Sequence, residues 1–193
     1  MAAFGLLELL IVFGLILVLS VMFYGSGSRS RQQTQKAACQ KNLLKIYVAL
    51  EIFANEHEGL FPNSAGAAFA EEPLGLLIPH YTVDSGSFIC PSSKDSSLSS
   101  GEPLTKHRIS YAYLMGRRLT DSQEVLMTDK QVNAQPKWAG QPVFSTNGEP
   151  PGNNHQKYGG NFLFGDGHVE MSDATAPFSL VWTQGVVLLN PKP

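Results

Sequence analysis

The chain opens with an almost unbroken apolar run. Residues 4–24 read FGLLELLIVFGLILVLSVMFY, and Glu8 supplies the one charged side chain among these 21 residues. A helix of this length measures about 31 Å, which matches the hydrocarbon thickness of a bilayer. No Ala-x-Ala site follows the run, so it is typical of a retained helix and not of a cleaved secretory signal. The sequence therefore predicts a membrane-spanning helix over 4–24.

A second helical pattern begins near residue 32. The connecting segment 25–31 reads GSGSRSR, and we expect a flexible helix break there because glycine and serine are weak helix formers. Beyond it, apolar side chains recur at steps of three and four residues: Cys39, Leu43, Ile46, Tyr47, Leu50, Phe53 and Ala54. Gly59 and Pro62 mark the end of this helix. The stripe indicates packing against a globular head made of residues 32–193.

Strand-like patterns occupy much of the remaining chain. Apolar, β-branched and aromatic residues gather in five short runs: 108–114, 124–128, 161–164, 168–171 and 186–189. The two runs at 161–164 and 168–171 flank Gly165, Asp166 and Gly167, a sequence that favours a hairpin turn. The predicted fold class is α+β, with a long N-terminal helix packed on a small, mainly antiparallel sheet.

Composition and motifs argue against several functional classes. The net charge is -2, and the basic residues form no stripe with interleaved aromatic residues, so we predict no nucleic-acid binding by the subunit alone. Neither Gly-x-Ser-x-Gly nor His-Glu-x-x-His occurs in the sequence, and we predict that the protein is not an enzyme and uses no cofactor. Cys39 and Cys90 either form a disulfide, which an exported domain permits, or remain two unpaired thiols.

Metal binding is the main alternative that the polar residues leave open. His155, Asp166 and His168 are of the residue types that bind zinc. Asp166 lies between two glycines, however, where aspartate commonly serves a turn. Acidic residues from Asp166 to Asp173 do not have the spacing of a calcium loop, and we predict no metal. On the alternative hypothesis the chain is a membrane-anchored extracytoplasmic binding domain or metal-dependent domain.

The first residues resemble a known family. FGLLELLIV, at 4–12, is similar to the start of mature type IV pilins and type II secretion pseudopilins. The resemblance implies a leader at residues 1–3, removed by a prepilin peptidase that cuts between Ala3 and Phe4 and methylates the new amine. Ala3 stands where the family usually has glycine. The resemblance further implies that Phe4 and Glu8 direct assembly, with the Glu8 carboxylate pairing with the terminal amine of a neighbouring subunit.

Three later segments extend the resemblance. Residues 37–62 are similar to the helix end of pilin-like proteins, and 88–92 (FICPS) to their Cys-Pro-Ser segment. His155, Asp166 and Gly167 correspond to a His and Asp-Gly family signature, with ten intervening residues where related proteins have nine. The resemblance thus covers pieces of most of the chain and implies a pilin-like fold.

The function implied is that of a structural filament subunit. The filament is a type IV pilus or a type II secretion pseudopilus, and the sequence leaves that choice open. The implied partners are copies of this chain in a helical homopolymer, other pilins or pseudopilins, the prepilin peptidase and an inner-membrane assembly platform. The implied location is the bacterial inner membrane with an extracytoplasmic head, and then a periplasmic or surface filament. Arg29, Arg31 and Lys36 favour the opposite topology by the positive-inside rule.

Overall fold

The computed structural model describes the backbone of residues 5–193 and the side chains of residues 5–21 and 30–193. The chain divides into two compact units, Met1–Thr34 and Gln35–Pro193. The predicted leader, and with it the cleavage point between Ala3 and Phe4, lies outside the described residues.

The helix α1 spans Leu6–Glu56 and so contributes residues to both units. The helix is continuous through 25–31, where the sequence predicted a break. Glycine weakens a helix by about 1 kcal/mol per residue relative to alanine. It keeps its backbone N–H, however, so the helical hydrogen bonds are not lost. The helix ends where the N–H of Gly59 donates to the carbonyl of Ala54 at 2.8 Å. Gly59 has a φ of +77°, the left-handed conformation common at helix ends.

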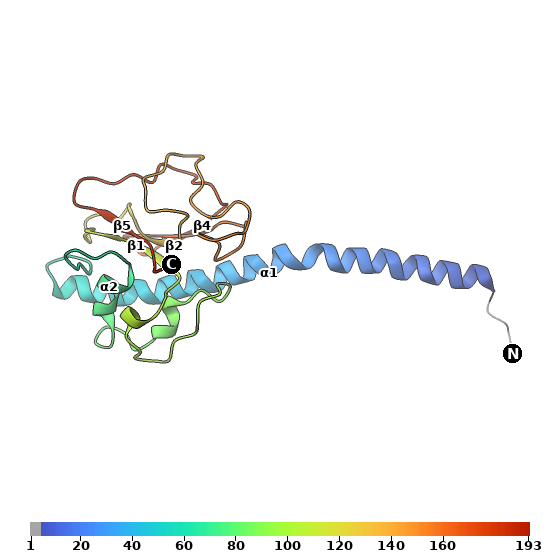
Figure 1. The fold of residues 1–193 in the computed structure, drawn as a ribbon, viewed down its shortest axis with the longest axis horizontal. Helices are drawn as coiled ribbons and strands as arrows, with labels where there is room; N and C mark the ends of the chain where they lie inside the picture. Colours follow the sequence, from blue (N-terminus) through green and yellow to red (C-terminus); the bar gives the residue numbers. More distant parts are fainter. Residues whose placement is uncertain (1–4) are drawn as a thin grey trace. The chain divides into compact units, whose positions relative to one another are not determined.

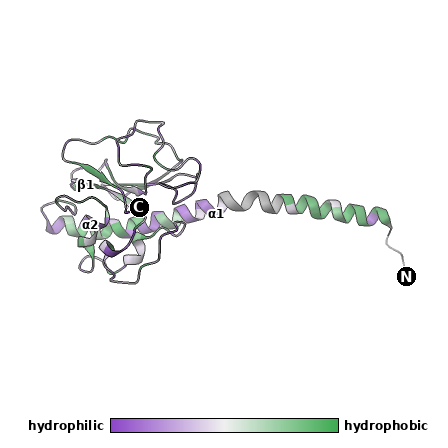
Figure 2. Ribbon diagram, in the orientation of Figure 1, coloured by the Kyte–Doolittle hydropathy of each residue, from purple (hydrophilic) through white to green (hydrophobic). Residues whose placement is uncertain are grey.

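The predicted pilin-like fold with a long apolar N-terminal helix is wrong. The apolar part of the N-terminal helix covers residues 6–21, which is a short segment, and no long apolar helix is present in the described part of the chain. Among the residues searched, no helix combines the length and the apolar character needed to cross a membrane. Figure 2 shows where the apolar residues of α1 lie.

The second unit is an α+β domain with one antiparallel sheet of five strands in the order β4-β3-β2-β1-β5. The strands are β1 (Tyr111–Met115), β2 (Val125–Asp129), β3 (Gly160–Phe164), β4 (Val169–Ser172) and β5 (Val187–Leu189). The five strand predictions are therefore confirmed, with no end shifted by more than three residues. Short helices precede the sheet: α2 (Glu71–Leu74), η1 (Gly75–Leu77), η2 (Ser85–Phe88) and η3 (Leu104–Lys106).

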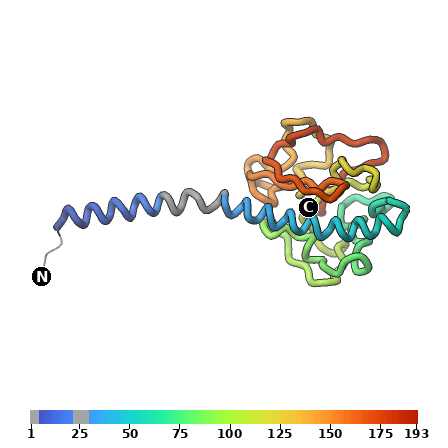
Figure 3. The backbone as a smooth tube through the Cα atoms, turned by 180° about the vertical axis from the view of Figure 1, so that it is seen from behind, coloured from blue at the N-terminus to red at the C-terminus, as the bar shows by residue number. Residues whose placement is uncertain are grey.

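Two apolar clusters lie on the two faces of this sheet. Strand β1 illustrates the division, because Tyr111 and Tyr113 belong to one cluster while Ala112 and Leu114 belong to the other. Alternate side chains of a strand point to opposite faces. The first cluster includes the buried stripe of α1, and Figures 1 and 3 show residues 35–56 of this helix against the rest of the unit from both sides.

Candidate functional site

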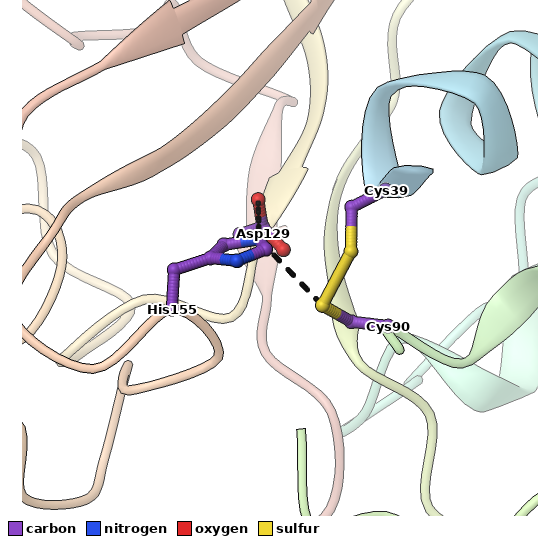
Figure 4. Close-up of side chains that lie close together, drawn as sticks. All are labelled: Cys39, Cys90, Asp129 and His155. Atoms are coloured by element: carbon purple, nitrogen blue, oxygen red, sulfur yellow. Dashed lines mark hydrogen bonds and ion pairs between the residues drawn. A yellow bond between two sulfur atoms is a disulfide. The ribbon is translucent and has the colours of Figure 1, made fainter. Parts of the chain in front are cut away.

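Four buried side chains meet between the helix and the sheet of the second unit. Cys39 comes from α1, Cys90 from the segment after η2, Asp129 from the end of β2, and His155 from the loop before β3. Cys39 and Cys90 are joined by a disulfide. Figure 4 shows His155 lying between the Asp129 carboxylate and the sulfur of Cys90. We refer to these four residues as the buried cluster.

The imidazole of His155 is held on both of its nitrogens. Its Nε2 lies 3.4 Å from Oδ2 of Asp129 and 3.6 Å from the sulfur of Cys90. Its Nδ1 lies 2.8 Å from the hydroxyl oxygen of Ser92. That hydroxyl donates to the carbonyl of Asn154 at 2.5 Å. We therefore assign the hydrogen between His155 and Ser92 to Nδ1, because a carbonyl only accepts and a hydroxyl donates once.

Asp129 is surrounded by donors. The side-chain amide of Asn154 donates to Oδ1 at 2.8 Å, while the backbone and side-chain N–H groups of Asn161 donate to Oδ2 at 2.8 and 2.9 Å. Burial opposes the charged carboxylate, but attraction to His155 and these hydrogen bonds outweigh it and hold the pKa of Asp129 below its usual range. The Oδ2 atom of Asp129 thus faces Nε2 of His155 at 3.4 Å, and the carboxylate and the imidazole form a buried pair.

The connection from Ser92 through His155 to Asp129 invites comparison with a hydrolytic triad. In such a triad the histidine accepts the hydrogen of the serine hydroxyl. Here the Ser92 hydroxyl gives its hydrogen to the Asn154 carbonyl, and the imidazole donates to Ser92. The donor order is opposite to that of an activated nucleophile, so the arrangement favours a structural role for these three residues.

An open cleft lies beside the buried cluster. It measures about 860 Å³, and both Ser92 and Asn154 contribute to its wall. Its rim carries charged side chains of both signs, among them Lys94, Asp95 and Glu149. Ser92, which is hydrogen-bonded to His155, therefore separates the cleft from the imidazole. His155 itself is fully buried.

The Asp-Gly pair of the predicted family signature lies in the turn between β3 and β4. Asp166 accepts hydrogen bonds from the backbone and imidazole N–H groups of His168, and these bonds hold the pKa of Asp166 below its usual range. Gly167 has a φ of +90°, and a Cβ at this position would lie 2.5 Å from the ring of Tyr47. The Tyr47 hydroxyl donates to the carbonyl of Gly165 at 3.0 Å. The turn is therefore fitted closely to α1.

The three residues considered as metal ligands do not come together. His155 is completely buried, whereas Asp166 and His168 lie in an exposed turn. The group of potential ligands found among the described residues instead joins His155 to Asp129 and the two cysteines. The sequence therefore singled out His155 correctly, but it grouped this histidine with Asp166 and not with Asp129.

Glu8 lies in the first turn of α1. Its Oε2 accepts the backbone N–H of Gly5 at 3.2 Å, a position in which an acidic side chain offsets unpaired backbone donors and the helix dipole. The carboxylate is thus directed toward the chain start, close in sequence to the predicted new terminus at Phe4. Pairing with a neighbouring subunit stays a prediction.

Sequence reasoning missed Asp129, Ser92, Asn154 and Asn161. Asp129 follows a strand pattern directly and looks like an ordinary turn residue, Asn154 lies in a loop rich in glycine, proline and asparagine, and Asn161 begins a predicted strand. Asp129 and Asn161 share one signal, a polar side chain at the end of a buried strand. Comparison with family models, with curated proteins and with solved structures found no match for this chain.

Proposed function

We propose that this chain is a structural subunit of a filament of the type IV pilus or type II secretion pseudopilus kind, assembled through its N-terminal apolar segment. The supporting observation is the exposure of that segment. Thirteen large apolar side chains between Leu6 and Val21 are 48–82% exposed. They include ten at consecutive positions in two runs, 9–13 and 15–19. Since successive residues are 100° apart around a helix, every side of the segment is apolar.

An apolar surface of this extent requires a covering. Packing equivalent segments of several copies against one another removes the side chains from water on all sides, as an assembled filament core does. Gly5 and Gly14 lie in the segment, and a Cβ at Gly14 would meet nothing within 4 Å. Small residues of this kind allow helices to approach one another closely.

The second unit also carries an apolar stripe on α1. Leu44, Val48 and Ile52 are 42%, 55% and 45% exposed, and their spacing of four places them along one side of the helix. This stripe lies opposite the buried face that packs on the sheet. In the proposed filament, neighbouring subunits cover it, so the second unit takes part in assembly too.

Glu8 is the residue that a simple anchor does not require. A carboxylate among apolar helices is costly unless it has a partner. In the proposed filament that partner is the terminal amine of a neighbour, which sets the register between subunits. The accompanying location, the bacterial inner membrane before assembly and a filament afterwards, rests on the sequence of residues 4–24.

The proposal is tested by mass analysis of the protein from native membranes and from the sheared surface fraction. A methylated Phe4 terminus and recovery in the sheared fraction are expected. Glu8→Ala should abolish or cripple filament yield, whereas Glu51→Ala, an exposed carboxylate of the same helix, should leave it unchanged. Full yield from Glu8→Ala contradicts the assembly role. An uncut chain that does not shear off favours the anchored binding domain instead.

A further inference from the structure

The buried cluster has the composition of a metal centre. The ligand atoms of Cys39, Cys90, Asp129 and His155 all lie within 4.8 Å of one another, and all four residues are buried. Two thiolates, one imidazole and one carboxylate form a donor set suited to zinc. In the structure the two sulfurs are bonded to each other, so the cluster is in its oxidised state.

The spacing of the atoms is close to that of a tetrahedral site. Bond lengths of about 2.0–2.3 Å around zinc place neighbouring ligand atoms about 3.3–3.8 Å apart. The Nε2 of His155 already lies 3.4 Å from Oδ2 of Asp129 and 3.6 Å from the sulfur of Cys90. Cleavage of the disulfide allows the two sulfurs to move apart to the separation that tetrahedral coordination requires. The backbone positions of the four residues can therefore stay as they are.

The surrounding residues already orient these ligands. The Nδ1 of His155 is bound to Ser92, which leaves Nε2 facing the cluster. Asn154 holds the Asp129 carboxylate through Oδ1, and Asn161 holds it through Oδ2, the oxygen that faces Nε2. Metal-binding histidines and carboxylates are commonly held by such outer partners. A disulfide alone gives no reason for an oriented imidazole and carboxylate beside its sulfurs.

We propose that the reduced form of this protein binds one zinc ion through Cys39, Cys90, Asp129 and His155. A phosphine or dithiol reductant supplies two electrons and is itself oxidised, and the sulfurs take up two protons to become thiols. Zinc then displaces both thiol protons into solvent, and Nε2 of His155 and the Asp129 carboxylate bind the ion through their lone pairs. The ion replaces the disulfide as the cross-link between α1 and the segment after η2. This inference is independent of the proposed filament.

The test uses the full chain, reduced with a phosphine and then freed of reductant under anaerobic conditions. Cobalt(II) serves as the spectroscopic probe and zinc as its competitor. We expect one cobalt per chain, an intense near-ultraviolet thiolate band, visible bands typical of tetrahedral coordination, and loss of these bands on adding zinc. The oxidised chain should show none of this. A reduced chain that retains its far-ultraviolet dichroism but gives no thiolate band overturns the proposal.

Variants then separate this site from adventitious binding. Ser92→Ala, which removes the partner of Nδ1 and leaves all four ligands in place, should weaken zinc affinity about 10- to 100-fold. The double change Asp166→Asn and His168→Gln alters the exposed pair and should leave affinity unchanged. Alkylation of the cysteines, followed by mass spectrometry, should slow at least tenfold in wild-type chain when zinc is present. If zinc does not slow alkylation of the cysteines, or if zinc affinity falls in the Asp166 and His168 double variant, the metal binds elsewhere and the assignment is refuted.

Discussion

The Nε2 of His155 lies 3.4 Å from Oδ2 of Asp129, with 0% and 1% of the two side chains exposed. The pair joins the loop before β3 to the end of β2. The Asp129 carboxylate is withdrawn from water, so it depends on His155 and its other hydrogen-bond partners for compensation. The contact therefore couples the position of the loop to the sheet, and through Cys90 to the disulfide with α1.

Replacing His155 with glutamine should destabilise the protein markedly. The change removes the imidazole that pairs with the buried Asp129 carboxylate, and breaking a buried pair of this kind typically lowers the free energy of unfolding by about 3–5 kcal/mol. Urea unfolding at neutral pH measures the change. The control is His168→Gln in the exposed turn, where we expect no more than about 0.5 kcal/mol. Similar losses in the two variants would contradict the importance of burial.

The disulfide should contribute substantially to stability. Cys39 and Cys90 are separated by 51 residues, and the chain-entropy treatment of a loop of this size gives about 4 kcal/mol. The double change of both cysteines to alanine should lower the free energy of unfolding by that order. Unfolding is measured with a chelator present, so that metal does not replace the cross-link. Reductant should weaken wild type and leave the double variant unaffected; equal stability without reductant would exclude the contribution.

Gly167→Ala should cost more stability than Gly140→Ala. Both glycines have positive φ values, +90° and +85°, so both substitutions carry a backbone penalty of about 1–2 kcal/mol. A Cβ at Gly167 also meets the Tyr47 ring, whereas one at Gly140 meets nothing within 4 Å. The steric overlap should add about 1–3 kcal/mol. Thermal unfolding of the two variants separates the effects, and equal Tm values would show that the turn moves away from α1 easily.

Lys137 should make stability rise with pH in the alkaline range. Its ammonium is buried with neutral acceptors such as the Asn133 and Gln135 carbonyls, and burial lowers its pKa to about 8 from 10.5. Between these values the unfolded chain binds more protons than the folded chain, so the free energy of unfolding increases with pH. Lys137→Met should reduce this increase in urea titrations from pH 8 to 10, while exposed Lys106→Met retains it; the part that remains is expected from Lys36, whose pKa burial also lowers. An unchanged slope in Lys137→Met would assign the increase to other groups.

Local patterning accounts for what could be predicted about the fold. Alternating and three-to-four residue spacings depend on which face of an element is buried, so they revealed the strands and the helical stripe of 39–54. The helix break predicted at 25–31 rested on helix propensity, which is a weak local bias. The prediction of a long apolar helix was wrong, because no long apolar helix is present in the described part of the chain.

The buried cluster depended on information that no local pattern contains. Asp129, Ser92 and Asn161 are ordinary polar residues in sequence, and each acquires its role from the contacts that the fold provides. The sequence did single out His155, but it associated this residue with Asp166 because the two share a motif. In the structure one is buried and the other is exposed.

By itself, the sequence determined the order and type of the elements, the two cysteines available for a cross-link, and the position of Glu8 at the start of an apolar helix. These follow from periodicity and composition, which act over a few residues. Only the tertiary structure decided that His155 pairs with Asp129 beside the disulfide, and that the turn at Gly167 fits against Tyr47. Such contacts join residues far apart in the chain, and their energies depend on burial, which local sequence does not specify.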